Sequence, residues 1–301
     1  MGEGRVHEDE AVKAVGEVHL YRPTPRFPQI SVTGEVCHLK CSHCAGRYLK
    51  GMRPALTGDK LKRVALEIER AGGLGILLSG GSSPSGEVMF KEDHVRAVKW
   101  IKDNTSLLVN LHPGLMRESL AEGFYSAGVD VVSLDIVGSE EAIKEVFHLH
   151  RTPRDFLFSY MMWKELGVEV VPHITVGLMC SRPSGEREAV EMLKEAPPQA
   201  LVFLGFIPTP STPYAGCFPP PEENILGIIR YAAETLPGTS LLLGCMRPRQ
   251  YRELELKAVE AGCRGVATPS PGLKRTLRER GYDVREVMGC CALHPLRERL
   301  F

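Results

Sequence analysis

Three cysteines crowd into eight residues near the start of the chain. Cys37, Cys41 and Cys44 read C-x3-C-x2-C within the segment VCHLKCSHCAGRYL. Three thiolates on one short loop can bind three corners of a cubane iron–sulfur cluster and leave the fourth iron without a protein ligand. An iron with an open position can chelate the amino and carboxylate groups of a small molecule. The spacing therefore predicts a 4Fe-4S cluster that takes part in catalysis.

Zinc is the alternative metal for this loop. Structural zinc sites have four protein ligands and often use paired C-x2-C motifs, which this spacing fits poorly. His38 or His43 could nevertheless complete such a site. Three unrelated buried cysteines are the remaining interpretation, and both alternatives stay open at this point.

A glycine-rich segment follows the next apolar run. Gly80, Gly81 and Ser82 begin the loop GGSSPSG, directly after LGILLS. Glycine lets a backbone approach a ligand closely, and backbone carbonyls can accept hydrogen bonds from an ammonium group. A simple turn after a strand is the alternative reading of this segment.

Together the two motifs resemble those of the radical S-adenosylmethionine (SAM) superfamily. Its C-x3-C-x2-C loop follows the first barrel strand, and its Gly-Gly-Glu loop follows the second, where this chain has Ser82 instead of Glu. An aromatic residue usually precedes the last cysteine and lies near the adenine; His43 holds that position here. The resemblance implies that a reduced cluster cleaves SAM and that the resulting 5′-deoxyadenosyl radical abstracts hydrogen from an unactivated carbon.

The resemblance extends to two more positions. Asp135, in VSLDIVGS, is expected to accept hydrogen bonds from the ribose hydroxyls, although a helix cap or a barrel-layer carboxylate is an equal alternative. Gly177 matches one glycine of the superfamily's G-x-I-x-G-x-x-E pattern and is expected to help bind SAM. His173, Thr175 and Cys180 depart from that pattern.

A repeated pattern of amphipathic helix, glycine and short apolar strand must position these residues. Strands without polar alternation are typical of a parallel sheet that is buried on both faces. Eight such strands are expected, over 29–36, 74–79, 106–111, 129–136, 168–177, 200–206, 240–244 and 264–268. Their alternation with helices favours an α/β fold of the closed (β/α)8 TIM-barrel type, with the chemistry at the carboxyl ends of the strands. The expected organisation is an N-terminal extension over 1–28, the barrel over 29–281 and a C-terminal tail over 282–301.

A second group of cysteines lies late in the chain. Cys245 ends the seventh expected strand, and Cys290 and Cys291 are adjacent in the tail, which could fold over the same rim. We interpret these three as ligands of a second iron–sulfur cluster. Cys180 and Cys217, in loops at the rim, could complete the set.

The segment LGCMRPRQYRELELKAVEAGCRGVATPSP resembles archaeal-type homologues of biotin synthase, some of which form two-protein lipoyl synthases. This resemblance implies sulfur insertion into an acyl chain, with the second cluster as sulfur source. Asn110 lies where biotin synthase has auxiliary cysteines. Arg247 and Arg249 are candidates for binding a substrate carboxylate or for filling a cluster position, and simple ion pairs are an equal alternative. A radical rearrangement or methylation is the rival reaction, and a zinc-stabilised binding module is the non-enzymatic alternative.

Composition narrows the possible partners. The 301 residues include 37 basic and 37 acidic side chains, so the formal net charge is zero and no strong field for nucleic acid or an anionic membrane is expected. No apolar stretch approaches the ~20 residues of a membrane-spanning helix, and the charged N-terminus lacks the apolar region of a signal peptide. We therefore expect a cytoplasmic protein. Its expected partners are a small-molecule or acyl-carrier substrate, a reductant such as ferredoxin and a paralogous partner enzyme.

Overall fold

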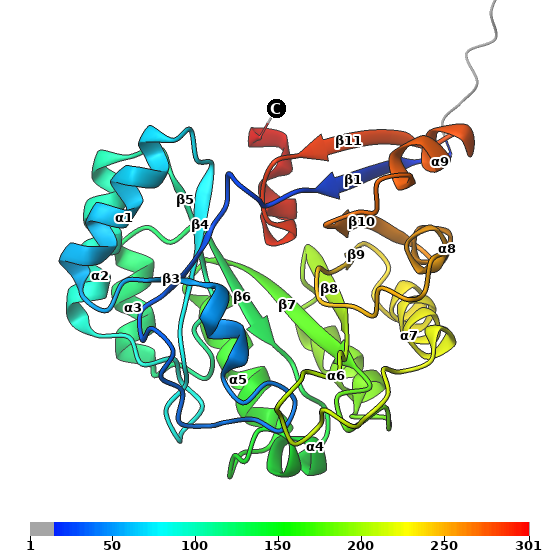
Figure 1. Ribbon diagram of the computed structural model, residues 1–301, viewed down its shortest axis with the longest axis horizontal. Helices are drawn as coiled ribbons and strands as arrows, with labels where there is room; N and C mark the ends of the chain where they lie inside the picture. Colours follow the sequence, from blue (N-terminus) through cyan, green and yellow to red (C-terminus); the bar gives the residue numbers. More distant parts are fainter. Residues whose placement is uncertain (1–14, 301) are drawn as a thin grey trace, which may run out of the picture.

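Parallel strands and helices alternate along residues 15–300, the part of the chain described by the computed structural model. The strands form one curled sheet in the order β11-β1-β10-β9-β8-β7-β6-β5-β4-β2-β3, and each neighbouring pair is parallel. Helices cover the outside of this sheet (Figure 1). The predicted α/β barrel of the TIM type is therefore confirmed.

The strands are β1 (Glu17–Tyr21), β2 (Gln29–Ser31), β3 (Arg53–Pro54), β4 (Gly75–Ser79), β5 (Leu108–Leu111), β6 (Val131–Asp135), β7 (Glu169–Val176), β8 (Ala200–Gly205), β9 (Ser240–Leu243), β10 (Cys263–Ala267) and β11 (Asp283–Val287). The α-helices are α1 (Gly58–Arg70), α2 (Glu92–Asn104), α3 (Glu118–Ser126), α4 (Glu140–Glu145), α5 (Pro153–Glu165), α6 (Glu186–Met192), α7 (Glu222–Thr235), α8 (Leu254–Glu260) and α9 (Leu273–Glu279). Three short 3-10 helices are η1 (Arg47–Gly51), η2 (Leu193–Glu195) and η3 (Cys291–Arg299). None of the helices within residues 15–300 has the length and apolar character needed to cross a bilayer.

Both faces of the strands are buried, which explains their continuous apolar sequences. On β8, Leu201 and Phe203 pack in the core between sheet and helices, whereas Ala200 and Val202 pack in a second core inside the barrel. Successive side chains of a strand point to opposite faces, so each strand contributes to both cores. The same alternation directs every second residue near the strand ends into the barrel interior.

Closure of the barrel differs from the expectation. All eight expected strands are present, but β1, β3 and β11 add to them, and the described strands leave β3 and β11 as edges of the sheet. β1 comes from the expected N-terminal extension and β11 from the expected tail, so the sheet includes strands on both sides of residues 29–281. These strands are short and carry charged residues, as in DVREV, and their partners are distant in sequence. Local patterning therefore did not reveal them.

The C-terminal segment fills the barrel interior. In η3, Ala292 and Leu293 are buried against Val131, Val171 and Ala200, which lie at or near the starts of β6, β7 and β8. η3 thus closes the end of the barrel where strands begin (red in Figure 1). The sequence allowed the tail to fold over the carboxyl rim; its apolar residues are instead buried inside the barrel.

Candidate active site

The cysteine loop, residues 37–44, is anchored through Ser42. The Ser42 backbone N–H donates to the carbonyl of Val146 at 2.8 Å, and its hydroxyl donates to the carbonyl of Glu145 at 3.1 Å. The same hydroxyl lies 3.3 Å from Nε2 of His148. These contacts tie the loop to the end of α4.

A tight turn brings the last two cysteines together. The N–H groups of Cys44 and Ala45 both donate to the carbonyl of Cys41, at 3.1 and 2.8 Å. Ala45 has a φ of 47° and Gly46 a φ of 76°. A positive φ is unfavourable for alanine and occurs mainly where surrounding contacts enforce it. This loop geometry therefore costs conformational free energy, which the surrounding contacts must offset.

Gly81 is required by the approach of this loop. A Cβ atom on Gly81 would lie 1.8 Å from the carbonyl oxygen of Val36 and 2.7 Å from Cα of Cys37. The N–H of Gly81 donates to Oγ1 of Thr33 at 2.7 Å, and the N–H of His38 donates to the carbonyl of Ser82 at 2.9 Å. The glycine segment and the cysteine loop, separate motifs in the sequence, thus form one packed unit.

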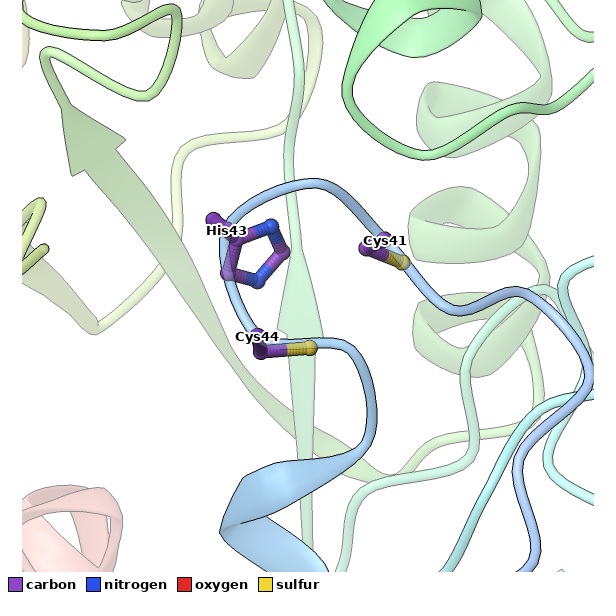
Figure 2. Close-up of side chains that lie close together, drawn as sticks. All are labelled: Cys41, His43 and Cys44. Atoms are coloured by element: carbon purple, nitrogen blue, oxygen red, sulfur yellow. The ribbon is translucent and has the colours of Figure 1, made fainter. Parts of the chain in front are cut away.

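The donor atoms of the loop suit a metal centre. The sulfur atoms of Cys41 and Cys44 and a ring nitrogen of His43 lie within 4.8 Å of one another, on one turn of the loop (Figure 2). A hydrogen bond from Cys41 lowers the pKa of the Cys44 thiol to about 4, whereas this bond and burial raise the pKa of Cys41. One thiolate is therefore available at neutral pH, and soft thiolates suit iron–sulfur clusters.

One central cavity collects most of the predicted site residues. It has a volume of 410 Å³ and a largely apolar wall. Its lining includes Cys37, Cys41, His43, Cys44, Gly80, Gly81, Ser82, Asp135, Cys245, Cys290 and Cys291. A smaller lobe of 220 Å³ shares His43, His112, Asp135 and His173 with it. The three-cysteine loop and the second cysteine set therefore border the same space.

Gly177 lies elsewhere. It lines a separate surface depression, and its N–H donates to Oε1 of the buried Glu186 at 2.8 Å. Its φ is 74°, and a Cβ atom there would lie 2.6 Å from Cβ of Pro220. This glycine serves a turn that packs beneath the Pro-rich loop, residues 207–221. The structure does not bring it to the cavity with the other predicted residues.

Three polar side chains, at or near the carboxyl ends of β5, β6 and β7, lie side by side at the rim of the cavity. Nε2 of His112 lies 3.8 Å from Oδ2 of Asp135, and the rings of His112 and His173 are 6.1 Å apart. Burial, with a smaller contribution from His112, lowers the pKa of His173 to about 4, so this ring is neutral at pH 7. Nδ1 of His173 bonds to the carbonyl of Val171 at 3.0 Å, which leaves Nε2 as the acceptor of the neutral ring.

Sequence reasoning missed His173, which was noted only as a departure from a motif. The available signal was strand parity. His173 lies two residues after Val171, which faces the barrel interior, and two residues before Thr175, which lines the smaller lobe. A polar residue on the inward face of a strand near its carboxyl end is a candidate for the site.

The second cysteine set reaches the cavity from two elements: Cys245 follows the carboxyl end of β9, and Cys290 and Cys291 lie at the start of η3. A hydrogen bond between adjacent side chains lowers the pKa of Cys290 and raises that of Cys291. Burial, followed by the nearby Cys290, raises the pKa of Cys245. Nδ2 of Asn110 lies 3.8 Å from Sγ of Cys290. Cys290 and Cys291 are thus hydrogen-bonded to each other in the same way as Cys41 and Cys44 in the cysteine loop.

The structure bears on two other expectations, one about Cys180 and Cys217 and one about the nearby arginines. Cys180 and Cys217 form a disulfide and so are not free to complete the second cysteine set; they meet because the Pro-rich loop folds back onto the loop after β7. Arg247 is buried and paired with Glu255, which also accepts from Arg249 at 3.4 Å. Both arginines thus form structural ion pairs.

Comparison with known proteins agrees with this geometry. Residues 31–205 match the family model described as the radical SAM superfamily. No curated protein gives a significant match. Among solved structures, methylornithine synthase is similar with 17% identity and a TM-score of 0.64, over 89% of this chain and 84% of that one. The [FeFe]-hydrogenase maturase from Carboxydothermus hydrogenoformans is similar with 17% identity and a TM-score of 0.63, over 92% of this chain and 69% of that one. At these identities the likeness concerns the fold.

Proposed function

The chain belongs to the radical SAM superfamily, and from this premise we propose that it inserts sulfur into an unactivated carbon of an acyl chain. Membership implies a 4Fe-4S cluster and SAM. When bound, the reduced cluster supplies the electron that cleaves SAM to methionine and a 5′-deoxyadenosyl radical. In our proposal, the three thiolates of Cys37, Cys41 and Cys44 hold the cluster.

The neighbouring residues bind and orient SAM in this proposal. His43 belongs to the cysteine loop, and its buried Nδ1 has no hydrogen-bond partner among residues 15–300. A bound ligand that donates a hydrogen bond would satisfy this atom. The backbone of Gly80–Ser82 forms the wall beside the cysteine loop, where it would bind the methionine part. Asp135, shared by both lobes, would accept hydrogen bonds from the ribose hydroxyls.

An apolar wall would protect the radical. Phe147, Phe156, Leu149 and Leu204 line the central cavity. Such side chains exclude water and offer no polar group to compete for the substrate. They also suit the alkyl part of an acyl chain, whose burial contributes roughly 0.8 kcal/mol per CH₂ group.

One observation carries the proposal beyond superfamily membership: Cys245, Cys290 and Cys291 line the same cavity as the cysteine loop. A substrate between the two groups would present one carbon to the radical on one side and to a sulfur source on the other. We propose that these three cysteines hold a second iron–sulfur cluster. In the same proposal, a reductant such as ferredoxin delivers the electrons. An acyl carrier or a partner enzyme delivers the acyl chain.

Anaerobic purification and reconstitution test this function. We expect the triple variant C245A/C290A/C291A to lose the iron and sulfide of one cluster and to retain formation of 5′-deoxyadenosine from SAM. Sulfur transfer to acyl substrates should be lost. C263A is the matched control, because Cys263 is buried at the start of β10, away from the cavity. Unchanged iron content in the triple variant would refute the second cluster, and bound zinc in the wild type would refute the first.

A further inference from the structure

Two buried polar side chains face the interior of the barrel, where most neighbours are apolar. Asn110 on β5 is 1% exposed, and Ser133 on β6 is 2% exposed. β5 and β6 are adjacent parallel strands, with Asn110 opposite Val131. Polar groups in such surroundings cost free energy unless they are hydrogen-bonded. Their contacts therefore indicate what they do.

Their hydrogen bonds point in one direction. Oγ of Ser133 donates to Oδ1 of Asn110 at 3.0 Å, and Nδ2 of Asn110 donates toward Sγ of Cys290 at 3.8 Å. Because the hydroxyl engages the amide oxygen, it sets which end of the amide faces the sulfur. The result is a short chain of donors that begins on β6 and ends at one cysteine of the second set.

All three groups border the central cavity. Asn110 therefore lies where the second cysteine set meets the space between the two cysteine groups. Within the second set, Cys290 is the member whose sulfur accepts the hydrogen bond from the Asn110 amide.

We propose that Asn110 is a positioning residue that donates an N–H···S hydrogen bond to Sγ of Cys290, and that Ser133 fixes the orientation of its amide, so that the pair tunes the reduction potential of the centre held by the second cysteine set. This inference rests on the proposed second cluster. Reduction adds negative charge to a cluster, so a donor to its sulfur stabilises the reduced form and raises its potential. A merely structural hydrogen bond would leave the potential unchanged.

Redox titration followed by electron paramagnetic resonance tests this role in the full-length, reconstituted protein. Asn110→Leu removes the donor at similar volume, and Ser133→Ala removes only the orienting hydroxyl. We expect both to shift the midpoint potential of the second cluster to more negative values, with the larger shift in Asn110→Leu. The potential of the first cluster should not change. Ser159→Ala is the control, because Ser159 is a buried serine of α5 in the outer helical layer.

The outcomes separate the two proposals. A second cluster that is present with an unchanged potential in Ser133→Ala and Asn110→Leu would overturn the inference and leave the proposed function intact. A wild-type protein with the iron of one cluster would overturn the second cluster and this inference with it. If Asn110→Leu does not assemble the second cluster, the test uses Ser133→Ala, which keeps the amide of Asn110. A shifted potential in that variant supports the inference, and an unchanged potential overturns it.

Discussion

Residues that bind no metal determine the shape of the cysteine loop. Ser42 ties it to α4, and Gly81 leaves space for its backbone. Such residues matter because a cluster with an open iron needs its three thiolates at fixed positions. A displacement of the loop would affect both metal binding and the proposed SAM pocket beside it.

Gly81→Ala should disrupt the first cluster. The new methyl group would lie 1.8 Å from the carbonyl oxygen of Val36, so the loop must move. We expect loss of most iron at this cluster and a decrease in 5′-deoxyadenosine formation of at least tenfold, since a small misplacement at a reacting centre has such effects. Iron analysis and product chromatography measure the two quantities. Gly227→Ala in α7 is the control, because its Cβ would meet nothing within 4 Å; equal iron in both variants would contradict the prediction.

Asp135→Asn should weaken SAM binding. If the carboxylate accepts from ribose hydroxyls, its replacement by a neutral amide removes charge-assisted hydrogen bonds worth about 1.5–3 kcal/mol. This corresponds to an increase in Kd of roughly tenfold or more. Equilibrium binding of SAM to the reconstituted protein measures it. Asp103→Asn is the control, because Asp103 is an exposed residue of α2 that pairs with Lys99, and this variant should bind SAM as the wild type does. An unchanged Kd in Asp135→Asn would show that Asp135 does not bind SAM.

At the scale of elements, η3 is held by a buried hydrogen bond. The hydroxyl of Tyr21 on β1 lies 2.5 Å from Nδ1 of His294 on η3. Burial lowers the pKa of His294 to about 3, so the ring is neutral and its Nδ1 can accept the bond. β1 and η3, from opposite ends of the chain, thereby fix the segment that begins with Cys290 and Cys291.

Tyr21→Phe should destabilise this arrangement. The variant leaves the buried Nδ1 of His294 without its donor, at a cost of about 1–3 kcal/mol. We expect a lower midpoint of chemical denaturation and a lower occupancy of the second cluster than of the first. Tyr125→Phe is the control, because Tyr125 is 48% exposed on α3. Denaturation curves that coincide with those of the wild type would argue against an anchoring role.

The disulfide fastens the Pro-rich loop above the site. Cys180 and Cys217 are 37 residues apart, and the N–H of Tyr214 in that loop donates to the carbonyl of Ser42 at 3.1 Å. By loop entropy such a crosslink contributes about 4 kcal/mol. The double variant C180S/C217S should therefore be cleaved faster by protease within 207–221 and should no longer respond to a thiol reductant. Cleavage at the wild-type rate would show that the loop does not depend on the disulfide.

At the scale of the whole molecule, buried histidines make stability depend on pH. Burial lowers the pKa of His173 to about 4 and of His294 to about 3, and also lowers those of His19 and His94. The unfolded chain takes up these protons near pH 6.5, before the folded chain does. Their contribution is therefore fully present above pH 6.5 and decreases as the pH falls toward the folded-state values.

We expect the free energy of unfolding to fall below pH 6.5 by up to about 1.4 kcal/mol per pH unit for each such histidine. Urea denaturation of the cluster-free protein at pH 7.5, 6.0 and 5.0 measures the slope. His294→Gln keeps an acceptor but does not titrate, so its slope should be smaller than that of the wild type. An identical slope would show that His294 does not contribute.

Local features of the chain were sufficient for much of the fold and part of the site. The eight expected strands are present because continuous apolar runs between helices report burial on both faces, which depends on nearby residues alone. The cysteine loop and Gly80–Ser82 were found for the same reason: each is a short contiguous motif. His43, in the cysteine loop, and Asp135, at the end of β6, border one cavity with them.

Contacts between distant residues were decided by the folded chain. β1 and β11 pair with each other, with Asp283 opposite Glu17, although they lie near opposite ends of the chain. The insertion of η3 likewise places Cys290 beside Asn110, which is 180 residues away in sequence. Gly177 matches a local motif but lines a separate surface depression, next to residues 178 and 186 of the smaller lobe. Pairing of short polar strands, the filling of a barrel and the meeting of two loops in a disulfide depend on packing among all elements. No periodicity within one segment encodes them, and so the route by which Cys290 and Cys291 reach the cavity, through the insertion of η3 into the barrel, was decided by the tertiary structure.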